Sequence, residues 1–167
     1  NLLRKACWKY CKQLGVNSTT FNLAFNESLI AQNEFKTQVK AKNIEIFDYA
    51  KNNNKLIVLV ASHPYHIDHF IHQQVSQILS DLGVSVINED IAFGEENEGF
   101  DSYYSIAQWE YPNRILQAAW WASVQDYSIG LIQLNSFGCG PDSFIMDEIN
   151  NLAKHTDMSF ALVRIDE

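Results

Sequence analysis

The sequence predicts a three-layer α/β fold with a flavodoxin-like (Rossmann-like) parallel sheet of about four strands, preceded by a helical lead-in. Short apolar runs alternate with helical patterns along the chain, and each run is rich in β-branched residues or bounded by polar turns. The continuous Leu-Ile-Val-Leu-Val run at residues 56–60 indicates a strand covered on both faces, as in parallel sheets. Right-handed crossovers between such strands give a doubly wound sheet, with the ligand loops at the carboxyl ends of the strands.

The predicted elements follow one another in a simple order. Helical patterns come first, at about residues 2–14 and 22–50, and three asparagines at residues 52–54 then end the pattern. The predicted strands are residues 55–61, 84–88, 128–135 and 159–165. We therefore expect a helical lead-in over residues 1–54 and an α/β domain over residues 55–167.

Three helices are predicted between these strands. Apolar residues recur with a 3.6-residue period over residues 67–82, and Gly83 ends this helix where a left-handed residue is favoured. Pro112 suits the start of a second helix, and a third precedes the last strand. The residues expected to face the core are Ile115, Leu116, Ala119 and Trp120 in the second helix, and Phe144, Ile145, Ile149 and Leu152 in the third.

Composition and charge restrict the class of protein. A chain of 167 residues with 47% hydrophobic residues can bury a substantial core. The net charge of −8 and the scattered twelve basic residues argue against a nucleic-acid partner, and the acidic residues between 89 and 101 are typical of a solvated loop. The apolar runs are too short for a membrane anchor, and three cysteines do not make a closed disulfide framework. We expect a cytoplasmic protein and, because the chain starts at Asn1 rather than methionine, a fragment of a larger multidomain protein.

The most informative segment is residues 131–148, where an apolar strand leads through a glycine-flanked cysteine into a helix. Gly138 and Gly140 allow a tight turn and leave room near Cys139, and Pro141 suits the beginning of the helix. The unpaired N–H groups and the dipole at the helix N-terminus favour the thiolate, which binds metals or acts as a nucleophile. The alternative is a glycine-rich turn whose cysteine only packs.

Four histidines recur at every third position, at His63, His66, His69 and His72, which suggests zinc. On a helix, each step of three residues rotates the side chain by about −60°, so the later three rings cannot converge on one ion. We expect His69 and His72 to face solvent. His66 lies near the predicted ligand edge, where Asp68 can accept hydrogen bonds from a first helical turn. Tyr65 and His66 could offer hydrogen bonds or a proton to a substrate, or they could form an ordinary loop cap.

Three segments together resemble a known family. They are the Pro-Tyr-His-x-Asp motif at residues 64–68, the Trp-x-Tyr-Pro-Asn-Arg motif at residues 109–114, and Gln-Leu-Asn-Ser-Phe-Gly-Cys-Gly-Pro-Asp-Ser at residues 133–143. The chain resembles the 2-hydroxyacyl-CoA dehydratase and activator superfamily, in particular the large activator-like proteins related to 2-hydroxyglutaryl-CoA dehydratase. The resemblance covers residues 55–167 and is most specific at the cysteine motif, whereas residues 1–54 resemble the family only as a helical lead-in.

The resemblance implies an iron-sulfur protein of anaerobic metabolism. In such proteins an ATP-hydrolysing activase module sends a low-potential electron to a [4Fe-4S] cluster, which serves chemistry on an acyl-CoA or another small molecule. Carried over by motif, Cys139 would be a cluster ligand in a loop shaped by Ser136, Gly138 and Gly140. The neighbouring substrate loop would contain Tyr65, His66 and Asp68.

The chain also departs from the family pattern. Ser62 and His63 stand where Gly-Arg is usual, and His69 replaces a common proline, whereas Asn113 and Arg114 match a motif without an assigned role. By the resemblance, the partner cysteines of the family lie upstream, outside this chain. Cys7 and Cys11 could substitute for them, but a helical lead-in is a poor match for the family's ligand loops. A GxxxxGK[ST] phosphate-binding loop is absent from the sequence, so the ATPase would be another module of the parent polypeptide, and this chain alone is expected to be inactive.

Two other classes of function are compatible with parts of the sequence. A non-catalytic α/β scaffold or interaction domain could bind a phosphate or CoA at helix N-termini without any metal. A mononuclear zinc hydrolase built on His66 and a neighbouring histidine is disfavoured, because the histidines diverge on a helix.

Overall fold

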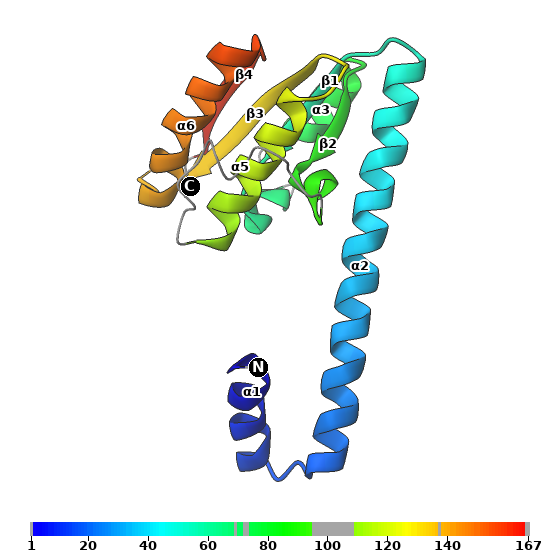
Figure 1. The fold of residues 1–167 in the computed structure, drawn as a ribbon, viewed down its shortest axis with the longest axis vertical. Coiled ribbons are helices and arrows are strands. Elements are labelled where there is room, and N and C mark those ends of the chain that lie inside the picture. The colour runs from blue at the N-terminus through cyan, green and yellow to red at the C-terminus, as the bar shows by residue number, and fades with distance from the viewer. Residues whose placement is uncertain (1, 69, 72–73, 95–108, 137, 166–167) are drawn as a thin grey trace. The chain divides into compact units, whose positions relative to one another are not determined.

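The computed structural model describes residues 2–68, 70–71, 74–94, 109–136 and 138–165, and Figure 1 shows the elements in order along the chain. The chain divides into two compact units, Asn1–Gln38 and Val39–Glu167. The boundary falls inside a long helix, because α2 (Ser18–Asn52) contributes its first part to one unit and its second part to the other. The division between a lead-in and an α/β domain at residue 54 remains a prediction about the sequence.

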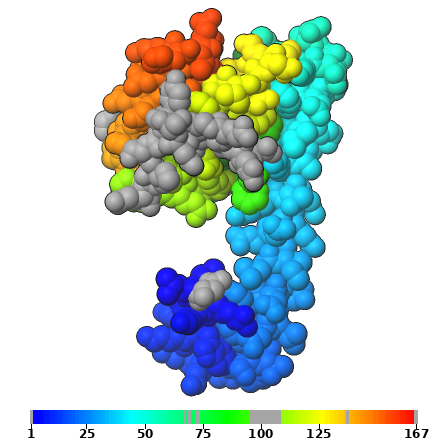
Figure 2. Space-filling view, in the orientation of Figure 1, coloured from blue at the N-terminus to red at the C-terminus, as the bar shows by residue number. Residues whose placement is uncertain are grey.

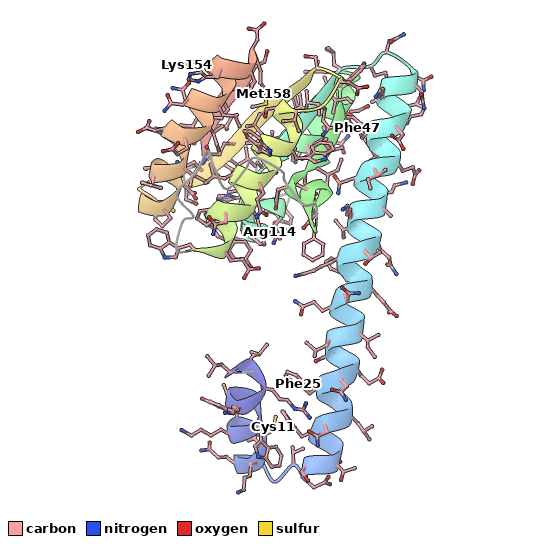
Figure 3. The ribbon with its side chains drawn as sticks, viewed as in Figure 1. Cys11, Phe25, Phe47, Arg114, Lys154 and Met158 are labelled. Atoms are coloured by element: carbon pink, nitrogen blue, oxygen red, sulfur yellow. The ribbon has the colours of Figure 1, made fainter. Side chains whose placement is uncertain are left out.

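The first unit consists of α1 (Leu2–Gln13) and the beginning of α2. An aromatic row holds the two helices together: the ring centroids of Trp8 and Phe21 are 5.1 Å apart, and those of Phe21 and Phe25 are 5.6 Å apart. The Arg4 guanidinium donates a 2.7 Å hydrogen bond to the Asn22 side chain. Figure 3 marks Phe25 on α2 and Cys11 on α1. The structure thus confirms the helical start of the chain.

The second unit is built on a parallel sheet that, within the described residues, has the strand order β2-β1-β3-β4. The strands are β1 (Ile57–Ala61), β2 (Ser85–Asn88), β3 (Ile129–Ser136) and β4 (Phe160–Ile165). In the central register, Leu59 of β1 pairs with Ile87 on one side and with Leu131 on the other. This is the order of a flavodoxin-like sheet, so the predicted fold class is confirmed.

Two helices, α5 (Glu110–Ser123) and α6 (Gly140–Thr156), pack on the sheet and form its main core. Ile115 and Leu116 of α5 and Ile145 and Ile149 of α6 are buried there, as the sequence predicts. Phe144, predicted in the same stripe, is 53% exposed. The exposure of Phe144 follows from helical geometry. Ile145, Ile149 and Leu152 form the buried face of α6, and Phe144 is rotated by about 100° from Ile145 around the helix axis. Figure 2 shows the surfaces of α6 and β4 together at one side of the unit.

The second part of α2 belongs to the same core. Phe47 is buried, and its ring meets the Trp121 ring of α5 edge-on at a centroid distance of 5.4 Å. Phe47 therefore points from α2 toward the sheet and its covering helices (Figure 3). The lead-in predicted as a separate element thus supplies part of the α/β core.

The helix predicted over residues 67–82 is wrong in its extent. The segment begins as a 3-10 turn, η1 (Pro64–Ile67), and the helix α3 spans only Val75–Asp81. The Asp68 side chain accepts a hydrogen bond from the Phe70 backbone N–H, and Gln74 has a left-handed φ of 61°, so the backbone does not continue as one helix. Gly83 has the predicted left-handed conformation with φ of 82°. None of the residues of α3, all of which are described, is buried.

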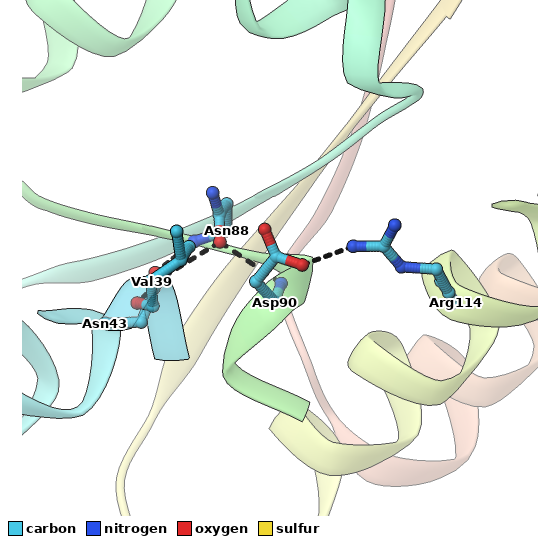
Figure 4. A network of polar contacts seen from close by, with 5 residues as sticks. All are labelled: Val39, Asn43, Asn88, Asp90 and Arg114. Carbon is cyan, nitrogen blue, oxygen red and sulfur yellow. Dashed lines mark hydrogen bonds and ion pairs between the residues drawn. The ribbon is translucent and has the colours of Figure 1, made fainter. Parts of the chain in front are cut away.

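A buried asparagine joins α2 to the end of β2 (Figure 4). The Asn43 side chain donates to the Val39 carbonyl and to Asn88 Oδ1, both at 2.9 Å, and accepts from the Asn88 backbone N–H at 2.7 Å. Asn88 Oδ1 in turn accepts from the backbone N–H of Asp90 and so caps η2 (Glu89–Ala92). The network fixes the loop that follows β2, where Asp90 also pairs with Arg114 of α5.

We expect Asn43→Ala to lower the free energy of unfolding by about 1–3 kcal/mol, because it removes a buried side chain that bonds α2 to β2 and leaves the partly buried N–H of Asn88 without this acceptor. Asn151→Ala is the matched control, because Asn151 is an exposed helical residue of the same unit. Denaturant unfolding followed by circular dichroism measures both variants. Equal stability of the two variants would show that this network contributes nothing measurable.

Candidate functional site

The candidate site lies at the edge of the sheet where the parallel strands have their carboxyl ends. The loop after β1 supplies His63 and His66, η2 after β2 supplies Glu89, and the turn after β3 supplies Cys139. The first turn of α6 adds Asp142. The fold therefore brings polar residues from three separate segments to one edge, as the sequence predicts for Cys139 and the histidine loop.

At the centre of this edge, His63, Cys139 and Asp142 lie together. His63 Nε2 is 2.6 Å from Asp142 Oδ1, and the potential ligand atoms of the three residues all lie within 4.8 Å of one another. Asp142 is fully buried, and its Oδ2 has no hydrogen-bond partner in the part of the chain that is described. A nitrogen, a sulfur and an oxygen donor thus meet in a mostly buried position.

Cys139 is the N-cap residue of α6 and is a partly buried thiol. Burial raises the pKa of this thiol; a hydrogen bond from the Asp142 backbone opposes the shift, and the Asp142 carboxylate adds to it. The prediction that the helix terminus favours the thiolate is therefore wrong in its direction. Burial of the thiol outweighs the backbone hydrogen bond at the helix N-terminus, and the neighbouring carboxylate adds to the increase.

The two glycines around the cysteine differ in what they do. Gly138 has a φ of 79°, which favours glycine, and the Cys139 N–H closes the turn on the Ser136 carbonyl at 3.1 Å. A Cβ added at Gly140 would meet no atom within 4 Å. Gly138 is thus needed for the backbone of the turn, whereas packing does not require a glycine at position 140.

Beside this centre, Tyr65, His66 and Ser136 form a second group. Ser136 Oγ lies 2.9 Å from His66 Nε2 and 3.4 Å from the Tyr65 hydroxyl. His66 is only 1% exposed, whereas Tyr65 is half exposed and stacks on the His63 ring at a centroid distance of 5.3 Å. The loop after β1 and the turn after β3 are therefore in direct contact, through Ser136 and through the His63 ring, which bonds to Asp142.

The remaining predicted residues of this loop have other places. The Asp68 carboxylate accepts the Phe70 N–H within its own loop, and the next helix that the structure describes, α3, begins at Val75. His66 belongs to a 3-10 turn, so the helical rotation used to separate the histidines does not apply to it. His69 and His72 lie outside the described residues.

Glu89 was missed by the sequence analysis, which placed it in a solvated loop. The residue is 3% exposed, and burial raises its pKa from the ordinary 4.5 to about 7. Asp90 contributes to the increase, whereas Arg114 and backbone hydrogen bonds of Glu89 and Ser62 oppose it. The prediction is wrong for Glu89, and residues 95–101 of that segment lie outside the described ranges. Its position directly after an apolar strand is the sequence signal that would have identified it.

Other buried polar atoms lie near this edge. Gln133 is fully buried, and neither its amide oxygen nor its nitrogen has a hydrogen-bond partner among the described residues; the same holds for Asn135 Oδ1. Arg114 of the motif without an assigned role forms an ion pair with Asp90, and its guanidinium lies 5.6 Å from the Tyr111 ring centroid. Arg114 therefore holds α5 against the loop after β2.

The ligand set of the α/β unit can be compared with the cluster that the resemblance implies. A [4Fe-4S] cluster is normally held by four cysteine thiolates. Residues 39–167 contain one cysteine, Cys139, and the other two of the chain are Cys7 and Cys11 in the first unit. The α/β unit alone therefore does not provide the ligand set of a complete cluster.

Comparison with known proteins agrees with an activator-type α/β domain. Residues 1–92 match the model of the family described as the CoA enzyme activase uncharacterised domain (DUF2229), which is more than half of the chain. The protein belongs to this family. No curated protein and no solved structure matches the chain.

The family match also changes the extent of the resemblance. It includes residues 1–54, for which the sequence resemblance was weak, and ends at Ala92, before the segment with Cys139. Family membership thus rests on the helical start and on the first βαβ unit, and the cysteine site rests on its own geometry. Within the described ranges, none of the helices combines the length and apolar character that a bilayer crossing requires.

Proposed function

We propose that this chain is a module of an activator of a CoA enzyme, of the kind that serves 2-hydroxyacyl-CoA dehydratases, and that it takes part in ATP-driven low-potential electron transfer. Membership of the activase-type family supports the activator role. The redox part rests on the resemblance of the cysteine motif at residues 133–143, whose Cys139 lies at the carboxyl edge of the sheet beside His63 and Asp142. This edge is where open α/β sheets bind their ligands.

In the intact activator, Cys139 contributes one thiolate to a [4Fe-4S] cluster whose other ligands come from outside the α/β unit. When bound, the cluster would supply one-electron transfer at low potential, and Cys139 is the residue of this unit that would hold it. ATP hydrolysis belongs to another module of the parent polypeptide, because the sequence lacks a GxxxxGK[ST] phosphate-binding loop. The partner that receives the electron is a CoA enzyme or its acyl-CoA substrate.

The residues around Cys139 have roles that follow from their contacts. His66 is buried and its Nε2 lies within hydrogen-bond distance of Ser136 Oγ, which orients the hydroxyl at the end of β3. Tyr65 is half exposed next to the same hydroxyl and is the member of the group that an acyl-CoA or a partner surface can contact. Tyr65, His66 and Ser136 therefore provide a hydrogen-bonding surface beside the metal ligand.

The test is anaerobic reconstitution, with iron and sulfide, of an activator polypeptide that contains this module. We expect Cys139→Ser to remove most of the bound iron and of the visible charge-transfer absorption, because serine replaces the thiolate ligand. Cys11→Ser is the matched control, since Cys11 lies on α1 in the other unit and should leave both readouts unchanged. Unaltered iron content in Cys139→Ser would contradict the redox role.

A metal-free phosphate or CoA site at the N-terminus of α6 has less support. Helix N-termini bind anions through free N–H groups and the positive end of the dipole. In this protein the buried carboxylate of Asp142 already lies in the first turn of α6, where it would repel a phosphate.

A further inference from the structure

We propose that His63, Cys139 and Asp142 bind a single divalent transition-metal ion, with zinc or ferrous iron as the class of ion that fits. The inference concerns this chain by itself and does not depend on the activator function. The three donors come from two segments 76 residues apart in sequence, the loop after β1 and the start of α6. An ion at this position would join these segments at the carboxyl edge of the sheet.

The donor set matches the chemistry of such ions. Zinc is bound in proteins by cysteine sulfur, histidine nitrogen and aspartate oxygen at about 2.0–2.3 Å, so ligand atoms around one tetrahedral ion lie roughly 3–4 Å apart. The ligand atoms of the three residues already lie within 4.8 Å of one another. Movements on the order of 1 Å would bring them to coordination distance. Three protein ligands leave the fourth position open for water or a substrate atom.

The burial of Asp142 is an independent observation that favours a cation. Buried carboxylate oxygens are almost always hydrogen-bonded, and buried charges are paired or coordinate metals. Asp142 is 0% exposed, its Oδ1 is satisfied by His63, and its Oδ2 has no hydrogen-bond partner among the residues described. A cation between Asp142, His63 and Cys139 would satisfy this carboxylate.

The three ligands are also held in place by their surroundings. Cys139 and Asp142 are the N-cap and the third residue of α6, and the Ser143 N–H and hydroxyl both bond to the Cys139 carbonyl at 3.1 and 2.9 Å. The His63 ring stacks on Tyr65 with an interplanar angle of 12° and meets the Tyr111 ring edge-on. Rigid support of this kind lowers the cost of ordering the ligands when an ion binds.

The site differs from the zinc site that the histidine spacing suggests. Of the two histidines of this series that the structure describes, His63 contributes a donor and His66 does not, and the other two donors come from the motif around Cys139. His66 instead contacts Ser136. The proposed site therefore does not depend on the spacing of the histidines. It depends on the fold, which brings His63 close to Cys139 and Asp142.

The test is a titration of the chelator-treated chain with Co²⁺ and Zn²⁺. We expect one equivalent to bind, with a thiolate-to-cobalt charge-transfer band that Cys139→Ser abolishes. Asp142→Asn and His63→Gln should each weaken binding more than about 100-fold, because even changes outside the ligand shell cost about 10–100-fold. His155→Gln is the matched control, since His155 is an exposed histidine near the other end of α6. Far-UV circular dichroism verifies that each variant is folded. If Asp142→Asn does not fold, Asp142→Glu takes its place.

The outcomes separate this inference from the electron-transfer proposal. Binding without a thiolate band, or binding that is unchanged in Asp142→Asn and His63→Gln, overturns the single-ion site. Iron uptake that requires sulfide and Cys139 but not Asp142 also overturns it, and leaves the cluster proposal standing. One equivalent of Co²⁺ or Zn²⁺ that requires all three residues supports the single-ion site.

Discussion

Replacing Glu89 by glutamine should stabilise the protein by about 3 kcal/mol at pH 8 and have little effect near pH 4. Burial raises the pKa of Glu89 from 4.5 to about 7. Between these values the folded protein keeps a proton that the unfolded chain has lost, so the free energy of unfolding decreases as the pH rises. The stability associated with Glu89 is fully present below pH 4.5 and is lost as the pH passes through 7, whereas glutamine is neutral throughout.

The measurement is denaturant unfolding of the wild type and of Glu89→Gln at several pH values between 4 and 8. The difference between the two proteins cancels the contributions of other titrating groups. Glu45→Gln is the control, because Glu45 is a surface residue that pairs with Lys42 and surface pairs contribute about 0–1 kcal/mol. A difference between Glu89→Gln and the wild type that does not change with pH would disprove the buried, protonated state of Glu89.

A carboxyl group with a pKa near 7 also has consequences for the site. Groups with such perturbed pKa values concentrate at functional sites, because they can gain or lose a proton near neutral pH. Glu89 lies directly after β2 at the carboxyl edge, in the loop that Asn88 caps and Arg114 holds. Glu89 can therefore change its protonation state near neutral pH at this edge, and it is not one of the three proposed metal ligands.

The strands could be predicted from the sequence because burial on both faces leaves a direct signal. The runs at residues 55–61, 84–88, 128–135 and 159–165 correspond to β1, β2, β3 and β4 with end points that differ by one or two residues. The helix predicted over residues 67–82 was wrong in extent because a periodic apolar pattern does not report side-chain hydrogen bonds that end a helix. The Asx-type bond of Asp68 and the left-handed Gln74 decide that segment.

The site could be predicted only in part. Cys139 and its turn were identified because a glycine-flanked cysteine between a strand and a helix is a local pattern. Asp142 and Glu89 were not, because the burial of a carboxylate depends on which segments cover it in the fold. The pKa of Cys139 was predicted in the wrong direction for the same reason, since the burial of the thiol, the largest cause of the increase, is a tertiary feature.

The second large effect is expected in the core, where Leu59→Ala should lower the free energy of unfolding by about 2–5 kcal/mol. Leu59 is fully buried at the centre of β1 and pairs with Ile87 and Leu131 on the two sides. Its removal leaves a cavity that α5 and α6 cannot close without losing their own contacts with the sheet. Thermal and denaturant unfolding both measure the loss.

The control for this prediction is Leu56→Ala, because Leu56 lies three residues earlier, immediately before β1, and is 75% exposed. Its truncation should change stability by less than about 1 kcal/mol. Similar losses in both variants would mean that the covering helices do not pack on β1 as the structure shows. The comparison also bears on the site, because β1 leads directly into the loop with His63: a cavity under β1 loosens the strand that positions this ligand, so metal binding should weaken in Leu59→Ala and not in Leu56→Ala.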